Sequence, residues 1–419
     1  MYLCLAKKKS GVSTRKKLTL FNDPIYGFIT IPSPLIFELI EHSYFQRLRR
    51  ISQMGMSYIV YPGAHHTRFH HAIGCMHLMQ KAVQVLRFKD ISISKEEEEA
   101  LYVAILLHDI GHGPFSHALE NSIVEGVNHE AISLLFMEEL NANFNERLTL
   151  AIQIFSDQYH KKFLHQLVSG QLDMDRLDYL KRDSFYTGVS EGNINSERLI
   201  TMLNVHNDTL VVESKAIYSV EKFIVARRLM YWSVYLHKTS LVAEQMLLNL
   251  LKRAKQLHLK GVKIKGSPAL LYFFDNKQNG FDTAALKMFA RLDDYDIIQA
   301  IKLWCDHDDI VLSSLSTMLI DRNLLKIKLK KRAFSEASKD KQLEKVMRHF
   351  KIGKDEAQFF VIDGAISNQA YSTKKENINM LSKSGKLVDA AKASDQLNIE
   401  ALSNKVSKHY LCYPKAKHY

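Results

Sequence analysis

The chain has 419 residues, of which 46% are apolar and 24% are charged. These fractions are those of ordinary globular proteins, so they exclude a disordered chain and a fibrous repeat. Lysine and arginine number 57 against 45 aspartates and glutamates, which gives a net charge of +12. A basic surface favours anionic partners such as nucleotides, nucleic acid or an anionic membrane surface, and a generally basic soluble protein is the alternative.

No apolar stretch approaches the roughly 20 residues that a membrane-spanning helix needs, and the first 17 residues lack the layout of a secretory signal. The four cysteines, Cys4, Cys75, Cys305 and Cys412, are widely separated and form no CxxC pair. This spacing argues against a disulfide framework or a thiolate zinc site. The sequence therefore predicts a cytoplasmic protein with reduced thiols and no membrane partner.

The first predicted element is a short β-hairpin or extended arm at residues 18–31, where β-branched and aromatic residues surround the turn-forming NDP. From about residue 35 the pattern is helical. Apolar residues at spacings of three and four predict a helix over 67–88, and another runs over 96–107 and ends before Gly111. Further helical patterns cover 129–141, 173–183, 220–258 and 284–304.

The pattern changes again near residue 320. KIKLKK, AQFFVIDGAIS and KHYLCYP alternate or cluster apolar residues as strands do, and SKSGK is typical of a hairpin turn. We therefore predict a mainly α fold with three parts. These are an N-terminal β arm at 1–34, a helical domain at 35–320 and a small mixed α/β (α+β) subdomain at 321–419.

Histidines gather in one part of the helical region. Nine of the 19 fall between His65 and His129, and LLHDIGHGPFSH at 106–117 places three of them beside an aspartate. Imidazole and carboxylate together suit Zn, Fe, Mn, Ni or Co. His108 and Asp109 are neighbours at a helix end, about 100° apart, so both can lean toward one ion. A further histidine and a second aspartate from other helices would complete a catalytic metal site.

The residues His71, His108, Asp109 and Asp175 resemble the H…HD…D metal signature of the HD-domain phosphohydrolase superfamily. FNDPIYGFITI, QRLRRISQMG, YPGAHHTRFHHAIG, HDIGHGPFSHALE, NHEAIS and DMDRLDYLKRDSFYTG resemble, in order, segments of its deoxynucleoside triphosphate (dNTP) triphosphohydrolase branch, which includes dGTPase-like enzymes. The resemblance covers about residues 18–240. It implies an HD-domain helical bundle in which those four residues bind one divalent transition metal, and it allows a further Mg²⁺ bound with the nucleotide phosphates.

The same resemblance implies roles for catalytic residues. His112 and His117 would face the phosphates, and His117 would donate a proton to the leaving oxygen. Glu120, three residues later on the same helical face, would orient His117. The branch often has aspartate where this chain has Glu120, but the longer side chain of glutamate should still reach His117. His129 would belong to the same network.

The substrate contacts that the resemblance implies fall into two groups. Arg68, Arg176 and Arg227 would contact phosphate oxygens, although the branch tends to have lysine where this chain has Arg176. The remaining four would meet the nucleoside: Gln53 and Tyr179 under the sugar, Asp183 at its 3′-hydroxyl and Tyr235 near the base. Both tyrosines could equally be core aromatics with a satisfied hydroxyl.

Together these residues imply metal-assisted hydrolysis of a dNTP to deoxynucleoside and triphosphate. One alternative is an HD-type nucleotidase or phosphomonoesterase that acts on a smaller phosphate ester. An alternative of another class is a nucleotide-responsive nucleic-acid-binding protein, suggested by a basic stripe. The stripe consists of Lys326, Lys328, Lys330, Lys331 and Arg332, and such lysines are also typical of an exposed edge strand.

The branch forms dimers, tetramers or hexamers, so the resemblance also implies a homo-oligomer, dimer or tetramer. In some members the NDP arm and the QRLR segment build effector sites between subunits, a pattern that Gln46 and Arg49 fit. The residues before FNDP do not match closely, so nucleotide activation stays open. The native metal, the preferred base and the role of the C-terminal part also stay open.

Overall fold

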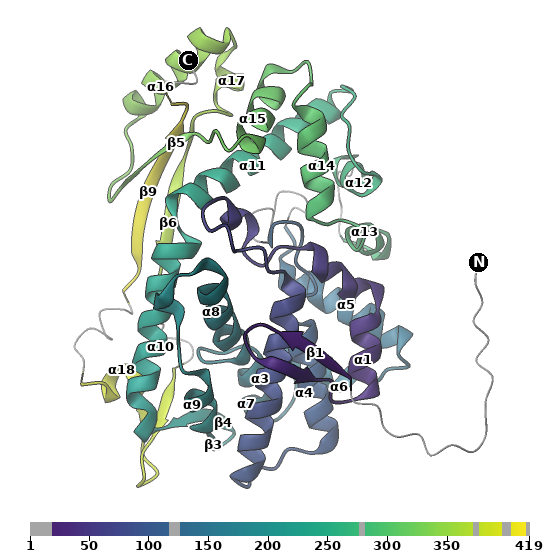
Figure 1. The fold of residues 1–419 in the computed structure, drawn as a ribbon, viewed down its shortest axis with the longest axis vertical. Coiled ribbons are helices and arrows are strands. Elements are labelled where there is room, and N and C mark those ends of the chain that lie inside the picture. Colours follow the sequence, from purple (N-terminus) through teal and green to yellow (C-terminus); the bar gives the residue numbers. More distant parts are fainter. Residues whose placement is uncertain (1–18, 117–125, 276–280, 372–376, 396–403, 416–419) are drawn as a thin grey trace, which may run out of the picture.

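The structure is a computed structural model that describes residues 19–116, 126–275, 281–371, 377–395 and 404–415. Helices dominate the described residues, and three small sheets accompany them (Figure 1). The predicted mainly α fold is therefore confirmed. None of the helices in the described ranges is both long and apolar enough to cross a lipid bilayer.

The predicted N-terminal hairpin is present. Strands β1 (Leu20–Asp23) and β2 (Gly27–Thr30) pair in antiparallel fashion. The Asp23 carboxylate closes the turn between them because it accepts hydrogen bonds from the backbone amides of Ile25 and Tyr26, at 2.9 and 3.0 Å. Four short helical segments lead from this hairpin to the bundle: α1 (Pro34–Glu41), α2 (Ser43–Gln46), η1 (Arg47–Arg50) and η2 (Gly55–Ile59).

Helix α3 (Arg68–Phe88) forms the centre of the bundle and packs against α4 (Lys95–Leu107) and α8 (Met174–Thr187). Helix α4 begins directly after Ser94, because Ser94 and Glu97 form a reciprocal capping box. Gly74 permits the close approach of α3 and α8, since a Cβ atom there would lie 2.2 Å from a carboxylate oxygen of Asp178. The three helices therefore meet closely enough for their side chains to share one site.

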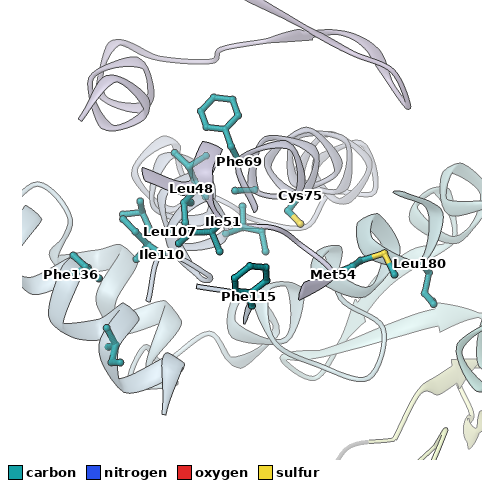
Figure 2. Close-up of a cluster of buried hydrophobic side chains, with 14 of the residues drawn as sticks. Leu48, Ile51, Met54, Phe69, Cys75, Leu107, Ile110, Phe115, Phe136 and Leu180 are labelled. Carbon is teal, nitrogen blue, oxygen red and sulfur yellow. The ribbon is translucent and has the colours of Figure 1, made fainter. Parts of the chain in front are cut away.

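A cluster of buried apolar side chains fixes the segments around this meeting point (Figure 2). Burying one such side chain contributes roughly 1.5–3 kcal/mol, so the cluster holds its loops firmly. Met54 and Phe115 also line the cavity described below. The labelled members are Leu48, Ile51, Met54, Phe69, Cys75, Leu107, Ile110, Phe115, Phe136 and Leu180, all less than a tenth exposed.

The rest of the bundle follows the predicted order with two breaks. The helix predicted over 220–258 is divided into two. Its first part ends in a π-helical turn at Tyr231–Tyr235, and His237 caps the second part by accepting a hydrogen bond from the Thr239 amide at 3.2 Å. The helix predicted over 284–304 is also interrupted: its first part ends at Phe289, and Asp293 caps a new helix. Both predictions were wrong at these points because apolar spacing continues across the caps. The helices are α5 (His129–Asn143), α6 (Thr149–Phe155), α7 (Lys162–Val168), α9 (Ser196–Thr201), α10 (Ile217–Met230), η6 (Tyr231–Tyr235), α11 (Lys238–Leu259), α12 (Pro268–Asp275), α13 (Thr283–Phe289), α14 (Asp294–Trp304) and α15 (Ile310–Ile320), with the short turns η4 (Ser190–Gly192) and η5 (Ser214–Ala216).

The C-terminal part contains the predicted strands and follows one side of the molecule (Figure 1). Its antiparallel sheet has the order β5-β9-β6. A second sheet, of order β3-β4-β7-β8, joins a hairpin that the sequence analysis missed to the C-terminal part, because β4 pairs with β7. The boundary at 320/321 stays a prediction. The elements are β3 (Leu203–His206), β4 (Thr209–Glu213), β5 (Lys326–Lys330), α16 (Glu336–Phe350), α17 (Lys354–Ala357), β6 (Ile362–Asn368), β7 (Asn379–Leu381), β8 (Leu387–Asp389), α18 (Ala390–Ala393) and β9 (Val406–Tyr413).

Candidate active site

The three central helices bring the four predicted metal ligands together. His71 lies on α3, His108 and Asp109 follow the last residue of α4, and Asp175 lies in the first turn of α8. One carboxylate oxygen of Asp175 is 3.1 Å from His71 Nε2 and 3.7 Å from His108 Nε2. The Asp109 carboxylate lies 3.6 and 3.5 Å from the same two nitrogens. Two imidazoles and two carboxylates thus converge on one point.

The hydrogen bonds of the two imidazoles suit metal binding. His71 Nδ1 lies 2.7 Å from a carboxylate oxygen of Asp178, and His108 Nδ1 lies 2.6 Å from the carbonyl oxygen of Ile105. In both rings Nδ1 therefore carries the proton and donates it to these oxygens, and the unprotonated Nε2 faces the Asp109 and Asp175 carboxylates. His108 Nε2 is buried without a hydrogen-bond partner among the described residues. This donor set fits a divalent transition ion, and Asp178 would orient His71 as its supporting carboxylate.

The pKa shifts reflect how closely these opposite charges lie. Burial alone would lower the pKa of His108, but the charges of Asp109 and Asp175 outweigh it and raise the pKa. Burial alone would raise the pKa of Asp109, but Arg68, His108 and His112 hold it well below its usual range. The pKa of Asp175 is also lowered, because its contacts with His108 and His71 outweigh its burial. Both carboxylates are therefore ionised at neutral pH, as metal ligands must be.

The loop after α4 carries the predicted catalytic histidines. His112 Nε2 lies 3.3 Å from Asp109, and the His112 ring stacks on the ring of His129 at a centroid distance of 4.0 Å. These two predicted residues are thus adjacent to the predicted metal ligands. The predicted His117 and Glu120 lie outside the described residues, so their roles stay predictions.

Arg47, which was not predicted from the sequence, holds this loop in place. Its guanidinium is fully buried and donates to the carbonyl oxygens of His112 at 2.7 Å, Leu292 at 2.9 Å and Ile110 at 3.3 Å. Burial lowers the pKa of Arg47 to about 9, which still leaves it charged at neutral pH. Nothing in the sequence distinguishes Arg47 from the other arginines of QRLRR, because its partners are backbone atoms of distant segments.

A cavity of about 440 Å³ opens beside the Asp109 and Asp175 carboxylates, a volume suited to one small organic ligand. His112 and His129 line it as well. Arg68 lies between the cavity and the predicted metal ligands, since it forms an ion pair with Asp109 and donates to Ser116 Oγ at 3.0 Å. All seven predicted substrate residues line the cavity: Gln53, Arg68, Arg176, Tyr179, Asp183, Arg227 and Tyr235.

Several polar atoms of these lining residues are buried without a hydrogen-bond partner in the described part of the chain. They are Gln53 Oε1, Arg176 Nη1 and Arg227 Nε. An unsatisfied buried group costs about 1–3 kcal/mol, so such atoms are informative where they border a cavity. The guanidinium nitrogens offer donors to an anion, and the Gln53 oxygen offers an acceptor to a hydroxyl or amino group. The cavity is therefore equipped for a ligand that carries both kinds of group.

Asp183 and its neighbours form another side of the cavity. One Asp183 oxygen accepts a hydrogen bond from the Tyr235 hydroxyl at 2.8 Å, and the other lies 2.7 Å from His66 Nε2. The ring of Tyr179 packs edge-on against that of Tyr235 at 5.9 Å. A carboxylate has about four acceptor positions, so Asp183 retains capacity for a ligand hydroxyl. Both tyrosines pack on the core and line the cavity, so the two interpretations of them are compatible.

Some further residues at the site were not predicted. His66, which pairs with Asp183, was hidden among neighbouring histidines. Cys75 Sγ lies 3.4 Å from His71 Nδ1, but burial raises the pKa of its thiol, which favours packing over thiolate ligation. Glu244 of α11 lines the cavity, and burial raises its pKa to about 7. Only its place in the fold distinguishes it from other glutamates.

The residues predicted for effector binding lie elsewhere. Gln46 and Arg49 belong to α2 and η1, and Arg49 donates to the Gln46 side chain at 2.9 Å on the surface. The Arg49 guanidinium also lies 3.6 Å from the centre of the Phe69 ring. Neither residue lines the cavity. Their effector role stays a prediction.

Comparison with known proteins identifies the family. The HD domain matches residues 68–183, and the HD associated region matches residues 194–275. The uncharacterized protein YwfO of Bacillus subtilis (strain 168) is 31% identical over 414 residues, which cover 94% of this chain and 92% of that protein. The crystal structure of a phosphohydrolase from Bacteroides thetaiotaomicron VPI-5482 matches with a TM-score of 0.92 at 50% identity, covering 95% of this chain and 100% of that one.

A further relative is the deoxynucleoside triphosphate triphosphohydrolase SAMHD1 homolog of Dictyostelium discoideum, which is 30% identical over 263 residues. The match covers 58% of this chain and 51% of that protein, so the chain spans about half the length of this relative. The chain belongs to the HD-domain phosphohydrolase superfamily and is a hydrolase of this type. Over about three fifths of its length the chain is also similar to proteins named deoxynucleoside triphosphate triphosphohydrolase.

Proposed function

We propose that the chain hydrolyses deoxynucleoside triphosphates to deoxynucleoside and inorganic triphosphate. One observation carries this proposal. The three arginines and the Gln53, Tyr179 and Asp183 side chains line a single cavity that begins at the His/Asp site. A phosphomonoesterase needs only the arginines of such a cavity, which bind the phosphate. The hydrogen-bond acceptors of Gln53 and Asp183 suit the hydroxyl groups of a sugar.

The proposed substrate would lie with its phosphates toward Arg68, Arg176 and Arg227. Guanidinium groups bind phosphate oxygens in a bidentate way and would neutralise the charge that develops during cleavage. His112, held by Arg47 and facing Asp109, would donate a further hydrogen bond to a phosphate oxygen. A divalent ion held by His71, His108, Asp109 and Asp175 would supply an activated water and polarise the phosphoryl group.

His117, with Glu120 as its orienting carboxylate, would protonate the 5′-oxygen so that a neutral hydroxyl leaves instead of an alkoxide. At the other end, Asp183 would accept the 3′-hydroxyl, and Tyr179 would lie against the sugar ring. Gln53 and Tyr179 together would leave no room for a 2′-hydroxyl. Selection of deoxyribonucleotides over ribonucleotides follows from this arrangement.

The test is anion-exchange analysis of the products formed from each dNTP and its ribonucleotide counterpart, after reconstitution of the protein with Mn²⁺. The proposal expects triphosphate and deoxynucleoside from dNTPs, none from ribonucleotides, and none from H108A. H65A is the matched control, because His65 is an exposed histidine of the same segment that stacks on Tyr58. Release of orthophosphate would favour the nucleotidase instead, and no turnover would favour a nucleotide-responsive binding protein.

Three finer expectations accompany this proposal. They are a homo-oligomer, nucleotide activation through Gln46 and Arg49, and a cytoplasmic location. Light scattering coupled to size-exclusion chromatography would test the first. A hydrolysis rate that does not respond to added dGTP or GTP would remove the second.

A further inference from the structure

A second cavity lies at the far end of the molecule from the HD site. It has a volume of about 830 Å³, runs between β5 and α16, and shares no lining residue with the active-site cavity. Figure 1 shows α16 beside the end of the β5-β9-β6 sheet, well away from α3, α4 and α8. We call it the basic groove. Besides Lys415, which follows β9, six cations from its two facing elements line it: Lys326, Lys328 and Lys330 of β5, and Lys341, Lys345 and Arg348 of α16.

The fold directs these six side chains toward each other. Strand β5 is an edge strand whose residues alternate, with Ile327 and Leu329 packed on the core and the three lysines exposed. On α16 the three cations are spaced by four and three residues, so they share one face of the helix. The helix also carries Glu336, Asp340 and Glu344, but none of these lines the groove. Among the described residues the lining contains no carboxylate.

The lysines of β5 alone would be explained as protection of an edge strand. That explanation does not extend to the cations that α16 presents across the groove. None of the six forms an ion pair within the described ranges, and like charges that face one another repel. Residues 321–351 contain 11 lysines and arginines against four aspartates and glutamates, so much of the chain's excess of positive charge is concentrated here. A polyanion in the groove would relieve the repulsion.

Two aromatic rings indicate the class of polyanion. Phe334 and Tyr413 line the same groove and are half-buried. The Lys330 ammonium lies 4.6 Å from the centre of the Phe334 ring, and the Lys328 ammonium lies 5.7 Å from that of Tyr413. Proteins that bind single-stranded nucleic acid typically combine cations with aromatic rings, because the bases of a single strand are free to stack on the rings. A duplex offers phosphates but hides the faces of its bases.

We propose that the basic groove binds single-stranded nucleic acid, with phosphates on the six cations and bases against Phe334 and Tyr413. This proposal concerns a surface outside the active site and does not depend on the nucleotide that the HD site hydrolyses.

The test is fluorescence anisotropy of a labelled single-stranded oligonucleotide of about 20 nucleotides, measured with the full chain over a series of salt concentrations. The variant K341A/K345A/R348A should bind at least about tenfold more weakly, and its slope of log affinity against log salt should fall by about two, because each phosphate contact to a single strand contributes about 0.7. F334L keeps an apolar side chain but removes the ring. It should weaken single-strand binding by about tenfold with the salt slope unchanged.

The matched control is K260A/K263A/K302A, which removes three exposed lysines that do not line the groove and changes the net charge equally. It should bind as the unmodified chain does. Equal weakening in both triple variants would overturn the proposal, since binding would then follow net charge. No binding at low salt would also overturn it, as would equally tight binding of a duplex or of polyglutamate. Thermal unfolding at a temperature no lower than that of the unmodified chain, together with unchanged hydrolysis, verifies that the groove variant is folded.

Discussion

Two of the three arginines of the active-site cavity pair with carboxylates, whereas the cations of the basic groove are exposed and face one another. Arg68 pairs with Asp109, and Arg176 Nε lies 3.1 Å from a carboxylate oxygen of Asp173. Across the groove, Lys341 and Lys345 face the lysines of β5 without a carboxylate in the described lining. The two regions therefore attract anions in different ways.

The difference follows from solvent access. A buried charge must be paired or hydrogen-bonded, since its desolvation costs several kcal/mol, and the pairing fixes its geometry. An exposed lysine remains hydrated, so like charges can accumulate and attract a polyanion without fixed geometry. We therefore expect selectivity from the cavity and salt-sensitive affinity from the groove.

The largest effect is expected for D175N. The Asp175 oxygen that lies near both His71 and His108 would be lost as an anionic ligand. Hydrolysis should fall by at least about 10³-fold, because a catalytic ion supplies several kcal/mol and each 1.36 kcal/mol is tenfold in rate. Metal content by mass spectrometry should fall in parallel. D157N, at an exposed aspartate, is the control and should change neither quantity. Full activity in D175N would exclude the proposed ligand set.

R47M should give the largest loss of stability. The substitution leaves the carbonyl oxygens of Ile110, His112 and Leu292 without their buried donor. The free energy of unfolding in urea should fall by about 3 kcal/mol. R50M is the matched control, because Arg50 pairs with Asp293 at the surface, and the loss there should stay below about 1 kcal/mol. Similar losses in both variants would remove the distinction between buried and exposed cations.

D178N should weaken metal binding without removing a ligand. Asp178 holds His71 Nδ1 at 2.7 Å, and supporting carboxylates of this kind contribute about 10- to 100-fold to metal affinity. Competitive titration with Mn²⁺ measures the effect. Asp178 also pairs with Arg182, so thermal unfolding must be measured alongside. Lower stability with unchanged affinity for Mn²⁺ would make Asp178 purely structural.

E244Q should alter the pH dependence of stability. Burial raises the pKa of Glu244 to about 7, so the folded chain favours the protonated form and loses stability as pH rises from about 4.5 toward 7. Above that range, E244Q should be more stable than the unmodified chain by about 1–2 kcal/mol, a figure reduced for solvent in the cavity. Thermal unfolding from about pH 5 to pH 8 measures it. E344Q, at an exposed glutamate of α16, should show no such divergence.

The smallest effect is expected at the groove. Removing three facing cations in K341A/K345A/R348A relieves repulsion, so the free energy of unfolding at low salt should rise by up to about 0.5 kcal/mol. The gain should vanish as salt is added. Destabilisation that persists at high salt would mean that these side chains contribute to packing.

Sequence reasoning predicted the helices and ligands that depend on local pattern. The four candidate metal ligands could be chosen because His108 and Asp109 end one helix, and because His71 and Asp175 complete the order of the family signature that the sequence resembles. The breaks at His237 and Asp293 could not, because apolar spacing continues past them. The hairpin of β3 and β4 was not predicted, although Asn207 and Asp208 are typical turn residues and both adopt positive φ in its turn.

Residues that act through tertiary contacts left no local signal. Arg47 and Glu244 acquire their environments from segments more than 60 residues away or from the cavity itself. The sequence showed the basic stripe as the lysines of a predicted strand. It did not show that α16 presents further cations opposite this strand, because only the fold brings the two elements together.

The most direct test of the central claim is hydrolysis of dNTPs in water enriched in oxygen-18, with mass spectrometry of both products. If water attacks the α-phosphorus at the HD site, the heavy oxygen must appear in the triphosphate and the deoxynucleoside must remain unlabelled. Label in the deoxynucleoside, or labelled orthophosphate in place of triphosphate, would contradict the proposed reaction.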